Sequence, residues 1–82
     1  MSISIRPANA QAMARDVLRS VDIDVPADRT VVLTDGDATG PSPEGHLVNP
    51  GQVIFAAEQF AMITGLTVDG DALVEALPWK EA

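Results

Sequence analysis

The sequence from residue 49 to residue 65 is NPGQVIFAAEQFAMITG, and it predicts the helix around which the rest of the chain is organised. Asn49 is a favoured N-cap, Pro50 suits the first helical turn, and Gly65 is a natural C-terminal stop. At about 100° per residue, one broad face of this helix is apolar. That face consists of Val53, Ala56, Ala57, Phe60 and Ala61. We therefore expect it to pack against the core.

The other side of the helix 50–64 is only partly polar. Phe55 and Met62 are nearly aligned on it, and they lie between Glu58 and Gln59. A helix that is apolar almost all round is normally buried on more than one side, and a chain of 82 residues has little material to cover both. We therefore predict that these four residues bind a partner. In the alternative, the protein's own loop or tail covers them.

The segments before this helix predict a second helix and a pair of strands. Asn9 can cap a helix that runs to about Val21, because apolar residues recur there at helical spacing. These residues are Ala10, Met13, Ala14, Val17, Leu18 and Val21. Thr30–Thr34 is β-branched and apolar, which predicts a central strand. Leu47–Val48 is predicted to return as a short strand beside Val31–Leu33.

Shorter elements are predicted at both ends and in the middle of the chain. Ser2–Arg6 alternates between polar and apolar residues, as a half-buried strand does. Asp35–Gly45 contains three glycines and two prolines, so we predict an irregular loop. Thr67 or Asp69 can cap a last short helix over residues 71–77.

Together these elements predict an α+β fold. We expect a small two- or three-stranded sheet packed against two main helices and a short C-terminal helix, in a single small domain of residues 1–82. Trp79 follows the last predicted helix and is the fifth candidate partner-binding residue. It either extends the ridge of Phe55 and Met62 or covers that ridge within its own chain.

The composition narrows the classes of partner. Twelve acidic residues against five basic ones give a net charge of −7, which argues against nucleic acid and anionic membranes and favours basic surfaces or cations. The chain has no cysteine and a single histidine, so it has no disulfide or thiolate metal site.

No apolar run reaches membrane-spanning length, and Met1–Pro7 lacks the features of a signal peptide. We expect a protein of the cytoplasm, or of a virion or other assembly. The excess of arginine over lysine is typical of GC-rich genomes, such as those of actinobacteria and their phages.

A sharper motif lies at residues 31–39, which read VVLTDGDAT. It is similar to the first motif of haloacid-dehalogenase-type phosphatases, in which Asp-x-Asp-x-Thr follows an apolar strand. The resemblance implies that Asp35 is a nucleophile and Asp37 an acid/base in a magnesium-dependent reaction. That family also needs a lysine and distal acids on a wide α/β sheet, and the only lysine here is Lys80. We therefore interpret Asp-Gly-Asp as a turn after the strand.

The same acidic stretch also resembles the calcium loop of an EF-hand. Asp35 and Asp37 match its first and third positions. The pattern then departs from the family, because Pro43 stands at the ninth position and His46 stands where the bidentate glutamate belongs. A site formed by Asp35, Asp37 and Glu44 is an alternative to our first interpretation, which is a solvated acidic loop that binds no metal.

From these observations we predict a non-catalytic protein–protein interaction domain, or a structural or accessory subunit of a larger assembly. Its expected partners are other protein chains, in a homo-oligomer or a larger complex, with no cofactor, nucleic acid or membrane. The alternative is a divalent-cation-dependent binding domain, or a minimal phosphatase-like site, at Asp35 and Asp37.

Overall fold

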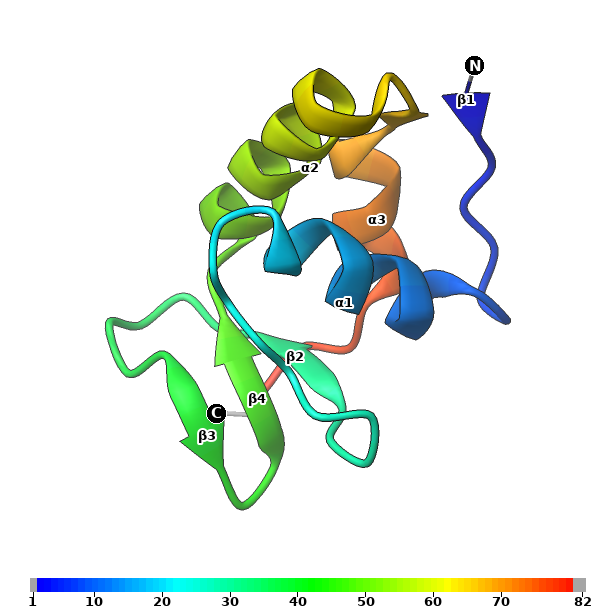
Figure 1. Cartoon of the computed structure of the whole chain (residues 1–82). Coiled ribbons are helices and arrows are strands. Elements are labelled where there is room, and N and C mark those ends of the chain that lie inside the picture. The colour runs from blue at the N-terminus through cyan, green and yellow to red at the C-terminus, as the bar shows by residue number, and fades with distance from the viewer. Residues whose placement is uncertain (1, 81–82) are drawn as a thin grey trace.

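The computed structural model describes residues 2–80 and shows three helices gathered at one end of a small three-stranded sheet (Figure 1). The elements in chain order are β1 (Ser2–Ile3), α1 (Ala10–Arg19), β2 (Val31–Leu33), β3 (Gly40–Ser42), β4 (Gly45–Val48), α2 (Pro50–Thr64), β5 (Thr67–Val68) and α3 (Gly70–Ala76). The predicted α+β class is confirmed. A separate parallel pair, β1 with β5, lies at the far side of the helices.

The order of strands corrects one prediction. In the three-stranded sheet the order is β2-β4-β3, so β4 is central and β2 lies at the side. The predicted pairing of Leu47–Val48 with Val31–Leu33 is confirmed, and it is parallel, with Val32 opposite Leu47 and Leu33 opposite Val48. The apolar, β-branched composition of Thr30–Thr34 predicts a central strand, but the structure places this strand at the side of the sheet. On the side of β2 away from β4, the helices and the C-terminal segment cover the strand, and within residues 2–80 no second strand of the sheet lies there.

The second correction concerns residues 35–45, which are not wholly irregular. β3 lies within this segment and pairs antiparallel with β4, with Ser42 opposite Gly45. The glycines that predicted a loop supply positive φ angles on both sides of the hairpin, 109° at Gly40 and 141° at Gly45. Pro41 is tolerated because β3 is an outer strand. The Arg29 guanidinium donates to the carbonyl oxygens of Ser42 and Gly45 and holds the hairpin against the preceding loop.

The outer side of β2 is closed by a side chain and by the C-terminal segment. The Gln11 amide pairs with the Val31 backbone: Val31 N donates to Gln11 Oε1 at 2.7 Å, and Gln11 Nε2 donates to Val31 O at 3.0 Å. Leu33 N donates to Pro78 O at 2.8 Å, and Lys80 N donates to Leu33 O at 2.7 Å. The outer edge of a sheet normally leaves backbone N–H and C=O groups free to pair with another strand. On β2 the groups of Val31 and Leu33 that point outward are already bonded.

We expect Gln11→Leu to lower the free energy of unfolding by about 1–3 kcal/mol, because it leaves the buried Val31 N–H and C=O groups without partners. Gln11→Glu is the matched variant, since a carboxylate still accepts from Val31 N but repels Val31 O. Urea denaturation followed by circular dichroism measures both. A cost below about 0.5 kcal/mol for both variants would mean that water replaces the Gln11 amide.

The core lies between the helices and the inner side of the sheet. Its largest fully buried side chains are Val17, Leu18, Val31, Leu33, Val48, Val53 and Leu73. In α1 the predicted stripe is confirmed: Ala10, Ala14, Val17 and Leu18 are buried, and Met13 packs against the core.

The ends of α1, α3 and β1 differ in detail from the sequence predictions. Asn9 is the N-cap of α1, but its side chain bonds backward, accepting from Arg6 N at 2.8 Å and donating to Ser4 O at 3.0 Å. Of the two candidate caps for the last helix, Asp69 is the one used, and Thr67 lies in β5. The predicted strand at residues 2–6 is shorter than expected, because β5 offers only two residues for it to pair with.

Candidate functional site

Helix α2 is fixed at both ends, and its bounds are those predicted. At its start, Asn49 N donates to Gln52 Oε1 at 2.8 Å. The Asn49 amide, oriented as its neighbours require, donates to Thr34 O at 2.7 Å and Gly36 O at 3.0 Å. At its end, Gly65 adopts φ 75°, and its N–H donates to Ala61 O at 2.8 Å. The helix is therefore a rigid element tied to the loop after β2.

The side of α2 that faces away from the core carries large apolar residues. Val53, Ala56 and Ala57 are buried, as predicted. Phe55 on the opposite side is 53% exposed and Met62 is 78% exposed. We define the outer face of α2 as Ile54, Phe55, Glu58, Gln59, Met62 and Ile63. The large apolar side chains exposed among residues 2–80 all belong to this face, apart from Trp79.

Sequence reasoning missed two members of the outer face. Ile54 is 36% exposed and Ile63 is 69% exposed, although neither was singled out as a candidate. Their positions lie a quarter turn to either side of the Phe55–Met62 line at about 100° per residue. The sequence did contain a signal for these two residues. Apolar residues occur in nearly every direction around this helix, and the burial of the face that carries Val53 does not account for those on the other sides.

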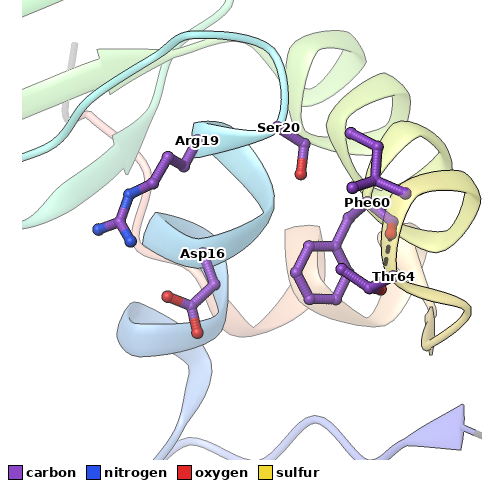
Figure 2. Close-up of a pocket in the computed structure, with 6 residues that line it drawn as sticks. Asp16, Arg19, Ser20, Phe60 and Thr64 are labelled. Atoms are coloured by element: carbon purple, nitrogen blue, oxygen red, sulfur yellow. Dashed lines mark hydrogen bonds between the residues drawn. The ribbon is translucent and has the colours of Figure 1, made fainter.

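A shallow hollow of about 380 Å³ adjoins the outer face, between α1 and the C-terminal half of α2 (Figure 2). It is lined by Asp16, Arg19, Ser20, Phe60, Ile63 and Thr64. The ring of Phe60 projects from α2 toward α1, and Thr64 Oγ1 donates to Phe60 O at 2.7 Å. The hollow therefore has an apolar floor with charged groups at its α1 side, and Ile63 belongs both to it and to the outer face.

The structure places Trp79 with the sheet rather than on α2. It pairs with Leu33 beside β2, where Pro78 and Lys80 make the backbone bonds. A second hollow there, of about 450 Å³, is lined by Thr30, Val32, Glu44, Pro78, Trp79 and Lys80. Neither of the two expected positions for Trp79, extending or covering the Phe55–Met62 ridge, matches this location.

The acidic residues of the alternative cation site are not gathered together. Asp35 and Asp37 are exposed in the bends after β2, whereas Glu44 is in the β3–β4 turn at the other end of β3. Ser42 Oγ donates to Glu44 Oε2 at 3.0 Å, and this bond lowers the pKa of the Glu44 carboxyl, with smaller help from the backbone and Lys80. Within residues 2–80, no three histidine, aspartate or glutamate side chains are placed to share a metal ion.

The Asp-Gly-Asp segment forms a bend in the chain directly after β2. Gly36 N donates to Thr34 Oγ1 at 3.2 Å, and Thr39 N donates to Asp37 O at 2.9 Å. The sheet that carries it has three strands, whereas the phosphatase family it resembles builds its site on a wide one. In the part of the chain that the structure describes, no helix is both long and apolar enough to cross a membrane.

Comparison of the chain with protein-family models, with curated proteins and with solved structures finds no match.

Proposed function

We propose that this protein is a non-catalytic interaction domain, a structural or accessory subunit that binds another protein chain through the outer face of α2, in the cytoplasm or within a larger assembly. One observation carries the proposal: Phe55 and Met62 project together into solvent from a helix whose opposite side is core. Aromatic and methionine side chains are enriched in protein interfaces, and removing their apolar area from water favours association.

The rigidity of α2 also supports binding. Gln52 and Gly65 close its ends, and Ala56 and Ala57 anchor it in the core. A face presented by a fixed helix loses little conformational entropy when a partner binds. Its single charged residue is Glu58, so a partner has little charge to desolvate there. The net charge of −7 favours partners whose surfaces are neutral or basic at the contact.

The test is a double substitution, Phe55→Ala with Met62→Ala, compared with the wild type as immobilised bait in an extract of the cells that produce the protein. Because both side chains are exposed, stability should change by no more than about 0.5 kcal/mol per site. Binding of the retained protein should weaken at least about tenfold. Trp79→Ala is the matched control, since it removes a large exposed side chain away from α2, and it should keep the binding.

The opposite pattern contradicts the proposal. If the double variant loses several degrees of melting temperature and retains every protein that the wild type retains, Phe55 and Met62 contribute to the core and not to an interface.

A further inference from the structure

The outer face of α2 has two unlike flanks, one on each side of the Phe55–Met62 ridge. At about 100° per residue, Glu58 lies between the ridge and Ile54. Gln59 lies between the ridge and Ile63. The Ile54 flank borders α3, and the Ile63 flank borders the hollow beside α1. A partner that lies along α2 therefore meets different chemistry on its two sides.

The flank next to α3 is acidic. A Cβ added at Gly70 would lie 3.1 Å from Ile54 Cα, so the first turn of α3 packs directly against this flank. Asp69 and Asp71 are on either side of Gly70 in the sequence, and both are exposed, as is Glu58. Neither α2 nor α3 contains a lysine, arginine or histidine that would offset these carboxylates. This flank therefore attracts positive charge.

The flank next to α1 is apolar. Phe60 and Ile63 line the hollow there. Figure 2 shows the ring of Phe60 turned toward α1, while the charged ends of Asp16 and Arg19 point away from that ring. An apolar side chain that enters the hollow thus buries its surface against the ring without meeting a charged group, which favours binding.

The sheet offers little edge for a partner that binds as a strand. The outer side of β2 is closed by Gln11 and residues 78–80, and β3 carries Pro41, which has no N–H to donate. The exposed ridge lies on a helix, and its two members are seven residues apart, or about 10 Å along α2. A second helix with apolar residues at helical spacing matches such a ridge.

We propose that the outer face of α2 binds a basic amphipathic helix of another protein. The inference rests on the proposed function and names the chemistry of its partner. The apolar side of the partner helix packs on the Phe55–Met62 ridge and inserts a side chain into the hollow at Ile63. Its lysines or arginines lie along the opposite flank, beside Glu58 and Asp71. The same arrangement disfavours acidic partners, a second copy of this chain included, because like charges would meet there.

Titration of the ¹⁵N-labelled protein with designed peptides tests this chemistry. The probe is a peptide of about 18 residues, blocked at both ends, with leucines at helical spacing and lysines elsewhere. One matched peptide has glutamate in place of every lysine. A second has the composition of the probe in an order without helical periodicity. At about 50 mM salt, where charge is only partly screened, binding of each is followed through the amide signals of α2.

We expect the lysine peptide to shift the amide signals of α2 with a Kd of roughly 10 µM to 1 mM, the range of a small interface. The glutamate peptide should bind at least about tenfold more weakly, because its charges oppose those of the acidic flank. The peptide without periodicity should also bind at least about tenfold more weakly, because it presents no continuous apolar side.

Two double substitutions that remove the same charge locate the carboxylates responsible. Glu58→Gln with Asp71→Asn should weaken binding of the lysine peptide about three- to tenfold, as expected for two exposed ion pairs. Asp28→Asn with Glu44→Gln, at the end of the sheet away from α2 (Figure 1), should weaken it less than about twofold. Phe55→Ala should weaken it at least about tenfold. Thermal unfolding checks that each variant is folded.

Three results overturn the inference. The first is a lysine peptide that leaves the α2 amides unshifted at about 1 mM. The second is a glutamate or non-periodic peptide that binds as tightly as the lysine peptide. The third is an equal effect of the two double substitutions, which would show that net charge alone attracts the peptide.

The bait experiment separates this inference from the proposed function. If retention of the bound protein depends on Phe55 and Met62 while the peptides fail these tests, the interaction function stands and its partner is of another kind, such as a neutral surface or a second copy. If neither retention nor peptide binding depends on them, both proposals are disproved.

Discussion

Leu18→Ala should lower the free energy of unfolding by about 2–5 kcal/mol. Leu18 is fully buried at the C-terminal end of α1 and belongs to the core that α1 shares with the other helices and β2. Truncation removes apolar contacts and leaves a cavity, and both effects destabilise the native state. A domain of this length has roughly 4–12 kcal/mol of stability in total. If the stability of the wild type lies near the lower end of that range, the variant is partly or wholly unfolded at room temperature.

The measurement is the urea midpoint of the variant beside that of Met62→Ala. Both substitutions shorten a large apolar side chain in a helix, but Met62 is 78% exposed and should cost no more than about 0.5 kcal/mol. If the two variants cost the same, Leu18 does not occupy the core position described for it.

Gly45→Ala should cost about 2–5 kcal/mol, for two separate reasons. The φ of 141° at Gly45 is a conformation that residues with a Cβ rarely adopt. A Cβ there would also overlap the carbonyl oxygen of Thr30 and lie 3.1 Å from Val32 Cγ2. Neither neighbour can easily move, because Thr30 O accepts from His46 N at 2.8 Å and Val32 is buried in the sheet.

Gly40→Ala separates these two reasons. Its φ is also positive, at 109°, but nothing lies within 4 Å of a Cβ placed there. It should therefore show only the conformational cost, about 1–3 kcal/mol, and the difference between the variants measures the collision with Thr30. Thermal unfolding of both checks this. Equal losses would show that β2 and β4 can separate locally at no cost.

The features that were predicted correctly are those determined by the local sequence. Helical periodicity with Asn49, Pro50 and Gly65 fixed the bounds of α2, and the stripe through Leu18 identified the buried face of α1. The β3–β4 hairpin was missed because the glycines and prolines of 35–45 are equally typical of a loop and of a hairpin with positive φ. Local residue type does not distinguish these two structures.

Other features depend on residues distant in sequence. Nothing around Trp79 indicates that residues 78–80 bond to Leu33, since that pairing joins segments some 45 residues apart. Likewise, Asn9 was recognised as a cap from its residue type, but its side chain bonds to Arg6 and Ser4 instead. For the candidate site, the sequence identified Phe55 and Met62. The apolar residues in nearly every direction around α2 also indicated Ile54 and Ile63, but their exposure in the folded chain was needed to assign them to the outer face.

The closure of β2 by residues 78–80 affects how the chain folds during translation. Val31–Leu33 leaves the ribosome well before Pro78 and Lys80, and β1 likewise precedes its partner β5 by more than sixty residues. Until residue 80 emerges, the Leu33 backbone on the outer side of β2 lacks its partners, and an unpaired strand edge of this kind can lead to aggregation. Pairings between such distant segments also slow folding relative to a simple helical bundle. We therefore expect the outer side of β2 to close only after synthesis has passed residue 80, with the β3–β4 hairpin formed earlier.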